Sequence, residues 1–267
     1  MKRVITELTF VCASFIAIGL IFTGLSDAKI DPKKDIAALW LFDEGKGKVA
    51  TDASPNGNDG EFFGSPTWVD GQFGKALEFN GTSDYVQVPD SPSLDIEEEI
   101  TIVAWVNWKT FKDAGILSKS QDGGGDGNYF LSTGCGGGPT QAKFGVISAA
   151  GHTCGPASAA LKPGQWYHVA GTFDGKQLAV YIDGALENAQ NHGGPLTTSD
   201  WPVIIGSYAG LGFKSNAIID ELAVFNVALD EKDINTIMNE GLEKGAGLAV
   251  SPKGKLATVW AEMKTQN

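Results

Sequence analysis

The chain has 267 residues, of which 42% are hydrophobic, and a formal net charge of −12. This length fits one large all-β domain, because β-sandwiches often reach about 200–250 residues as a single unit. The acidic balance argues against nucleic acid or an anionic membrane surface as the partner, since both attract basic patches. It permits divalent cations, which bind carboxylate and carbonyl oxygens, although we expect most of the acidic residues to serve solubility.

The N-terminus has the composition of an export signal. Lys2 and Arg3 precede an apolar run over residues 8–25, and the tripeptide SDA at 26–28 supplies the small residues that a signal peptidase reads. We therefore predict a signal peptide over residues 1–28, a secreted or cell-envelope location, and no membrane insertion of the mature chain. The apolar run is long enough to span a bilayer, so an uncleaved anchor is the alternative.

Most of the remaining chain alternates apolar and polar residues with the period of two that a half-buried strand requires. The alternation is strict over 100–106, and Asp174-Gly175 joins two such runs as a preferred hairpin turn. Strands are expected at 37–42, 77–79, 85–88, 100–106, 115–120, 129–133, 143–148, 166–173, 177–182, 203–206 and 218–225. The pattern predicts an all-β sandwich.

Two segments depart from the strand pattern. Residues 230–243 have an apolar face with helical spacing and predict one short C-terminal helix. The loop QDGGGDGN at 121–128 is typical of a hairpin tip, because glycines there usually serve turn geometry. It is also a candidate cation or sugar loop, with Asp122, Asp126 and Asn128 as oxygen donors.

Two cysteines remain once Cys12 leaves with the leader, namely Cys135 and Cys154. An even count in an exported protein predicts a single disulfide, between these two residues. The alternatives are two free thiols or a metal site that includes His152. Two cysteines and one histidine give too few ligands for a closed zinc site.

Seven stretches carry a family pattern: LWLFDEGKG (39–47), DASPNGNDG (52–60), GKALEFNGTSDYVQVP (74–89), ITIVAWVNW (100–108), WYHVAGTFDGKQLAVYIDG (166–184), IIGS (204–207) and IIDELAVFNVALDEKDI (218–234). In this order they resemble the laminin-G-like jelly roll of the concanavalin-A-like lectin/glucanase superfamily. The resemblance implies two stacked antiparallel sheets over residues 29–245, followed by a tail at 246–267. It also implies export, often a bound calcium, and glycans or proteins as partners.

The resemblance directs attention to the place where the two ends of the domain meet. In such jelly rolls the first and last strands pair antiparallel, which would bring Asp43 and Asp220 together, with Glu44 and Glu221 beside them. Neighbouring carboxylates repel each other, and a structural Ca²⁺ would relieve this repulsion. Asp84 is a third candidate ligand. The alternative is that these aspartates cap turns or pair with lysines.

Catalysis needs separate consideration because the superfamily includes glycoside hydrolases, which place two carboxylates about 5–9.5 Å apart around one sugar. The densest acidic run, at 95–99, looks like the polar lead-in to a strand and lacks the Glu-x-Asp-x-x-Glu spacing of the laminarinase-like enzymes. His152, His168 and His192 lie in separate segments, and no phosphate-loop or nucleophile motif is present.

We therefore predict a non-catalytic binding module, with a glycan as the first choice of ligand. Trp68 and Trp201 could stack on a sugar, although tryptophans in a sandwich more often anchor loops or the core. The alternative from another class is an adhesive or structural domain that binds an extracellular protein. A glycoside hydrolase or lyase is the weaker alternative.

Overall fold

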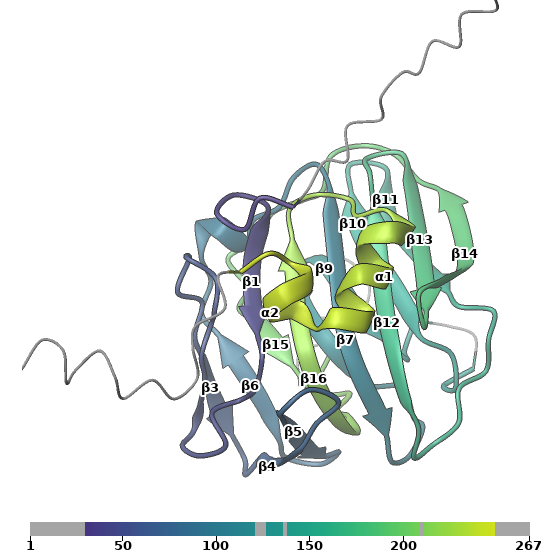
Figure 1. Cartoon of the computed structure of the whole chain (residues 1–267). Helices are drawn as coiled ribbons and strands as arrows, with labels where there is room; N and C mark the ends of the chain where they lie inside the picture. Colours follow the sequence, from purple (N-terminus) through teal and green to yellow (C-terminus); the bar gives the residue numbers. More distant parts are fainter. Residues whose placement is uncertain (1–29, 121–126, 136–137, 209–210, 249–267) are drawn as a thin grey trace, which may run out of the picture.

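The computed structural model describes residues 30–120, 127–135, 138–208 and 211–248. The described part is a sandwich of two eight-stranded antiparallel sheets, with two helices packed on one outer face (Figure 1). This arrangement confirms the predicted fold class. The predicted signal peptide and most of the predicted tail lie outside the described residues, so the domain boundaries stay predictions. No helix among the described residues is long and apolar enough to cross a membrane.

Sheet A has the strand order β14-β13-β12-β7-β16-β5-β4, and β1 also pairs with β16. In chain order its strands are β1 (Ile36–Trp40), β4 (Thr67–Asp70), β5 (Lys75–Asn80), β7 (Ile100–Trp108), β12 (Trp166–Phe173), β13 (Gln177–Ile182), β14 (Ala185–Asn191) and β16 (Asn216–Phe225). The late strand β16 therefore lies in the middle of the sheet. It contacts β7 along one side and β5 and β1 along the other.

Sheet B has the strand order β11-β10-β9-β8-β15-β6-β3-β2. In chain order its strands are β2 (Val49–Ala50), β3 (Gly60–Phe63), β6 (Tyr85–Val88), β8 (Gly115–Ser120), β9 (Gly127–Ser132), β10 (Lys143–Ser148), β11 (Gly151–Pro156) and β15 (Val203–Ile205). A short 3₁₀ helix, η1 (Pro92–Leu94), interrupts the connection between β6 and β7. This connection crosses from one sheet to the other.

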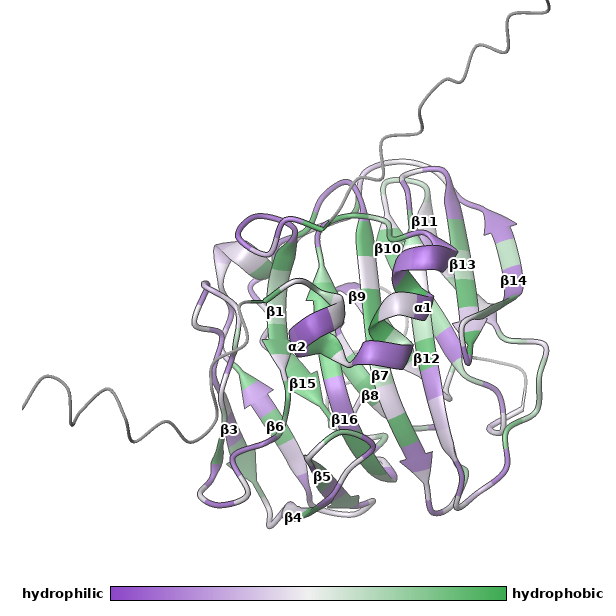
Figure 2. Ribbon diagram, viewed as in Figure 1, coloured by the Kyte–Doolittle hydropathy of each residue, from purple (hydrophilic) through white to green (hydrophobic). Residues whose placement is uncertain are grey.

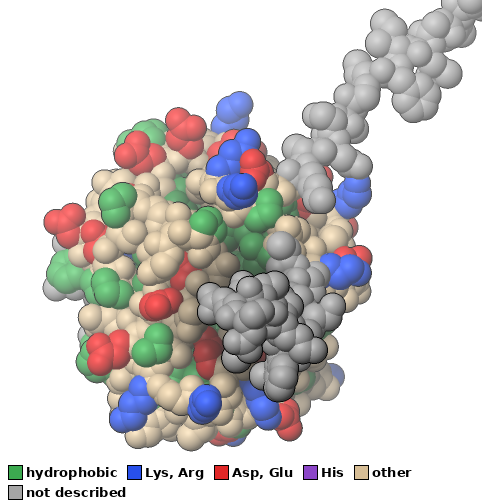
Figure 3. Space-filling model, turned by 60° about the vertical axis from the view of Figure 1, so that its left-hand side comes forward, with side chains coloured by type: hydrophobic (Ala, Val, Ile, Leu, Met, Phe, Trp, Pro, Cys, Tyr) green, Lys and Arg blue, Asp and Glu red, His purple; other side chains and the backbone are tan. Residues whose placement is uncertain are grey.

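The core lies between the sheets, and most strands contribute alternate buried residues to it. Hydrophobic residues recur along the central strands of the ribbon in Figure 2. In β7, Ile102, Ala104 and Val106 lie in this core, as the sequence alternation predicts. Val103 points the other way and packs beneath the helices, in a second apolar cluster. Acidic side chains are scattered over the face seen in Figure 3 rather than gathered in one patch, as expected for acids that serve solubility.

The helical segment covers the outer face of sheet A and is shorter than the sequence predicts. Helix α1 (Glu231–Glu240) begins at Asp230, whose carboxylate accepts the backbone N–H of Asp233 at 2.8 Å. The helix ends before Gly241, which has φ of 76° and ψ of 165°, and a single turn, α2 (Leu242–Gly245), follows. The apolar spacing continues past Gly241, but the backbone of this glycine is not helical.

Candidate functional site

A row of side chains crosses the outer face of sheet B. Ile204 of β15 is paired with Ser118 of β8 on one side and with Gln87 of β6 on the other. Val203 and Ile205, the neighbours of Ile204, point into the core, so the row points away from it. The register thus gathers residues from three distant segments on one surface.

A cleft of about 230 Å³ lies over this row. Its lining consists of Gln87, Ser118, Ser120, Trp201, Pro202, Ile204, Tyr208 and Leu211. None of these described residues is charged. Two aromatic side chains beside amide and hydroxyl groups give the cleft both an apolar surface and hydrogen-bonding capacity, which is the combination that small-molecule sites use.

The hydroxyl group of Ser120 is the most informative polar group in the cleft. The residue is 5% exposed, and its Oγ has no hydrogen-bond partner among the described residues. A buried hydroxyl without a partner costs free energy, so a water or a ligand that supplies a partner here would be stabilised. Tyr208 is held in place by ring contacts with Phe130 at 5.0 Å and Phe213 at 5.9 Å.

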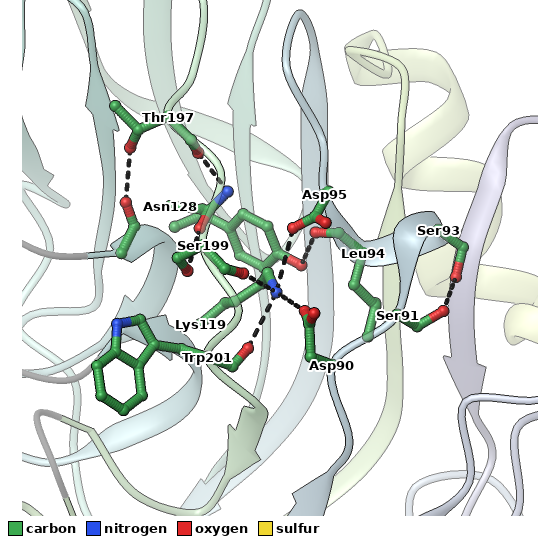
Figure 4. Close-up of polar contacts among 12 residues, drawn as sticks. Asp90, Ser91, Ser93, Leu94, Asp95, Lys119, Asn128, Thr197, Ser199 and Trp201 are labelled. Atoms are coloured by element: carbon green, nitrogen blue, oxygen red, sulfur yellow. Dashed lines mark hydrogen bonds and ion pairs between the residues drawn. The ribbon is translucent and has the colours of Figure 1, made fainter.

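Of the three loop candidates, the structure describes Asn128. Its Nδ2 donates to the carbonyl oxygen of Thr197, and its Oδ1 accepts the hydroxyl of Ser199 at 2.8 Å (Figure 4). The side chain is fully buried, so it holds a neighbouring segment in place and does not face a ligand. Asp122 and Asp126 lie outside the described residues.

The structure brings Asp43 and Asp220 together, as predicted from the pairing of β1 with β16. Both carboxylates lie beneath the turn between β4 and β5. The backbone N–H of Lys75 donates to Oδ1 of Asp43 at 2.8 Å, and that of Phe73 donates to Oδ2 of Asp220 at 2.9 Å. Glu221 follows with a positive φ of 49°, which turns it out of the regular strand.

Burial disfavours the ionised forms of Asp220 and Glu221. Burial raises the pKa of Asp220 to about 7, and the nearby charge of Asp43 adds to the rise. Burial likewise raises the pKa of Glu221 to about 8, with smaller contributions from Asp220 and Asp43. Backbone N–H donors oppose both rises but do not cancel them. Both groups therefore hold a proton more readily than ordinary carboxyl groups do near neutral pH, and a bound cation would favour their ionised forms.

The donor set of this cluster fits calcium in the type of ligand, carboxylate oxygen, but not in the number of ligands. The described residues contain no group of three His, Cys, Asp or Glu residues arranged to hold a metal. Calcium takes about six to eight oxygens, so backbone carbonyls and water would have to supply the rest.

Asp84 does not belong to this cluster, contrary to the expectation that it would be a third ligand. It follows the far end of β5, where its carboxylate accepts the N–H groups of Ser65 at 2.9 Å and Asn80 at 3.1 Å and the hydroxyl of Ser83 at 3.0 Å. Lys75 and Asp43 lie at the other end of the strand. Asp84 therefore stabilises the turn after β5.

Cys135 and Cys154 lie close together as free thiols in this structure. The Sγ of Cys154 is 3.6 Å from the carbonyl oxygen of Cys135, and the Sγ of Cys135 is 4.0 Å from Nε2 of His152. The disulfide is therefore not formed here, although the two residues are neighbours. It stays a prediction.

Two residues of the acidic run at 95–99 have partners within the domain. Asp95 forms an ion pair with Lys119 at 3.3 Å, and Glu99 accepts the backbone N–H of Ala228 at 3.1 Å. His168 is buried on sheet A beside Trp105, and burial lowers its pKa to about 3. Asp95, Glu99 and His168 therefore have structural surroundings.

The two tryptophans considered from the sequence have different roles. Trp68 packs on the core and donates its Nε1–H to the carbonyl of Gly47 at 3.2 Å. Trp201 lines the cleft. Sequence reasoning missed Gln87 and Ser120, because ordinary polar residues on strands give no signal until the register of the sheet places them together.

A family model confirms the resemblance. The model of the concanavalin A-like lectin/glucanase superfamily matches residues 80–235, more than half of the chain, and the chain therefore belongs to this superfamily. No curated protein matches its sequence.

Solved structures share the fold at low sequence identity. Domain 4 of AbnA, an extracellular GH43 arabinanase of Geobacillus stearothermophilus solved with arabinotriose, is similar with a TM-score of 0.61 and 20% identity, over 76% of this chain and 98% of that one. The binding domain of Paraclostridial Mosquitocidal Protein 1 is similar with a TM-score of 0.64 and 15% identity, over 79% and 53%.

A third similar structure is that of botulinum neurotoxin type C, whose cell entry depends on two ganglioside molecules. Its TM-score is 0.58 at 15% identity, over 77% of this chain and 51% of that one. This chain thus spans about half of the length of each of the two toxin structures. At such identities the likeness establishes the fold alone.

Proposed function

We propose that this domain is a non-catalytic module that binds an uncharged glycan in the cleft over β8, β15 and β6. The observation that carries the proposal is the buried, unpartnered hydroxyl of Ser120 beside the aromatic rings of Trp201 and Tyr208. Aromatic faces pack on the apolar faces of sugar rings, while amide and hydroxyl groups bond to sugar hydroxyls.

The chemistry of the lining favours a neutral sugar over an acidic one. None of the described lining residues carries a charge. Lys119, the buried lysine between Ser118 and Ser120, is already paired with Asp90 and Asp95. A sialylated or uronic acid ligand would therefore lose hydration without gaining a counter-charge. The likeness to an arabinanase domain solved with arabinotriose supports the choice of a neutral glycan.

The experiment is a glycan array probed with the purified full chain, followed by titration of the best ligand and of arabinotriose. Trp201→Ala should weaken binding about tenfold or more, as loss of an aromatic anchor does. Trp166→Ala is the matched control, since this half-buried tryptophan begins β12 on the other sheet. Absence of binding to every glycan would reject the proposal and favour the alternative, a surface that binds an extracellular protein.

The proposal that the module is non-catalytic rests on the packing around Asp220 and Glu221, which leaves no space for a substrate beside their carboxyl oxygens. Asp220 and Glu221 have raised pKa values, as general acids do, but the turn over them and the backbone of Leu242 occupy the space around their oxygens. Prolonged incubation with matched polysaccharides should release no new reducing ends. Release that disappears with Glu98→Gln or Glu99→Gln would establish a glycosidase instead.

We also propose a structural Ca²⁺ held by Asp43 and Asp220, with Glu221 beside them. The proximity of the carboxyl groups and the raised pKa values of Asp220 and Glu221 support the proposal, because a cation would favour their ionised forms. A bound cation there would supply positive charge and hold the ends of β1 and β16 beneath the turn between β4 and β5. This ion would stabilise the fold and would take no part in binding at the cleft on sheet B.

Export is proposed from the sequence of residues 1–28. A secreted or cell-envelope location suits a module for extracellular glycans. The measurement is the N-terminal sequence of the protein recovered from the producing cells. A mature chain that begins at Lys29 would support cleavage, and a chain that keeps the leader would support the anchor.

A further inference from the structure

Lys119 lies directly behind the cleft and is fully buried. It stands between Ser118 and Ser120, both of which line the cleft, so the alternation of the strand turns its side chain to the opposite face. Its partner across the sheet, Tyr129, also points into the core. A lysine in this position needs partners for its charge, because an unpaired buried ammonium is unstable.

The partners of Lys119 come from two separate connections. Its Nζ forms ion pairs with Asp90 and Asp95, in the connection between β6 and β7. It also donates to the carbonyl oxygens of Ser199 at 2.8 Å and Trp201 at 2.9 Å, just before β15 (Figure 4). An ammonium has three N–H donors, so these four acceptors use all of its capacity.

Asn128 holds the same segment at a second point. Its amide bonds Thr197 and Ser199, and the hydroxyl of Thr197 donates to the carbonyl of Gly127 at 2.7 Å. Residues 197–201 are thus held by β8 and β9. The last of them, Trp201, turns its carbonyl toward Lys119 and its indole ring away from it, into the lining of the cleft (Figure 4).

Pro202 limits the backbone on the other side of Trp201. A proline restricts the residue before it to extended conformations. With the carbonyl of Trp201 fixed by Lys119 and the following residue rigid, the direction of the Cα–Cβ bond of Trp201 is set, which limits where its indole ring can lie. The positive charge of Lys119 lies on the core side of sheet B. The cleft on the outer face therefore stays neutral.

We propose that Lys119 is the positioning residue for Trp201: the buried ammonium fixes the carbonyl oxygen of Trp201 and thereby holds its indole ring in the cleft. The role of the ring in binding rests on the proposed glycan function. The positioning itself does not, because it can be measured without a ligand.

The test is ¹⁹F NMR of the full chain labelled with 5-fluorotryptophan. The chain has seven tryptophans, so seven resonances are expected. Trp201→Phe identifies the resonance of Trp201. Lys119→Met should broaden or split that resonance and leave the others unchanged. Lys143→Met is the matched control: this lysine is equally buried and donates to two backbone carbonyls, those of Thr133 and Gly138, but does not contact residues 199–201. It should leave the Trp201 resonance sharp.

Lys119→Arg covers the case in which Lys119→Met does not fold. It keeps the charge and should keep a sharp Trp201 resonance, at a shifted position, because the longer side chain displaces the carbonyl. An unshifted, sharp Trp201 resonance in a folded Lys119→Met or Lys119→Arg protein would overturn the proposal.

Titration with arabinotriose then separates this inference from the proposed function. Where the wild type binds, Lys119→Met should weaken binding about as much as Trp201→Ala, about tenfold or more. Where the wild type binds no glycan, the proposed function fails, and the NMR result still decides whether Lys119 positions Trp201.

Discussion

Gly74 packs so closely against Asp43 that a β-carbon at this glycine would overlap Oδ1 of the carboxylate. Gly71 has the same relationship to Oδ2 of Asp220. The turn between β4 and β5 therefore has a glycine at each of the two positions where its backbone packs against a carboxylate, that of Asp43 or that of Asp220. Its fit over the two aspartates depends on the absence of side chains at both positions.

Gly74→Ala should destabilise the domain more than Gly57→Ala. Both glycines have positive φ, +60° and +72°, so each alanine carries the left-handed backbone penalty of about 1–2 kcal/mol. A β-carbon at Gly57 would have nothing within 4 Å, whereas one at Gly74 meets Asp43. Urea denaturation measures both losses, and equal losses would mean that the contact with Asp43 has no energetic weight.

Added calcium should raise the melting temperature of chelator-treated protein. An ion that binds the native state alone stabilises it by about 4 kcal/mol at a thousand times its dissociation constant. Asp220→Ala should abolish the response. Asp84→Ala should keep it, because this aspartate caps a turn at the far end of β5. The same melting temperature with and without calcium would remove the metal from the Asp43–Asp220 cluster.

His168→Phe should reduce the acid sensitivity of the domain. Burial lowers the pKa of His168 to about 3, below its ordinary value of 6.5, so below pH 6.5 the unfolded chain binds a proton that the native state does not. The wild type should lose up to about 1.4 kcal/mol for each pH unit below 6.5 from this group alone. The raised pKa values of Asp220 and Glu221 act in the opposite direction, but equally in both proteins.

Denaturation of the two proteins at pH 6.5, 5.5 and 4.5 makes the comparison. The free energies of unfolding should diverge as the pH falls. Parallel curves would show that His168 becomes protonated in the native state.

The two cysteines should differ in reactivity once the protein is reduced. A hydrogen bond from the thiol of Cys154 lowers the pKa of Cys135, while the same bond raises the pKa of Cys154. Because the thiolate is the reactive form, iodoacetamide should label Cys135 first. Before reduction, thiol titration should find no free cysteine, since we predict a disulfide worth about 2–4 kcal/mol. Two reactive thiols in the unreduced protein would refute the bridge.

The strands were predictable from the sequence because side-chain alternation is a local property. It located β7 by its apolar positions and β12 and β13 by the turn between them. The meeting of Asp43 and Asp220 was also predictable, since it follows from the pairing of the first and last strands in the resembling family.

The cleft could not be predicted in this way. Gln87, Ser118 and Ile204 are ordinary strand residues that only the register of three strands brings into one row. The burial of Lys119 is equally hidden, because lysines are mostly exposed and its stabilising carboxylates come from a different connection. Both features arise from contacts between segments distant in sequence.

The central place of β16 in sheet A also bears on how the protein folds. Its residues, Asn216–Phe225, are made after all the other strands of the sheet, yet β5, β7 and β1 all pair with them. The sheet therefore cannot close while the ribosome is still making the first 200 residues, and non-local pairing of this kind is slow. Until residue 225 has been made, β5, β7 and β1 lack the strand that joins them.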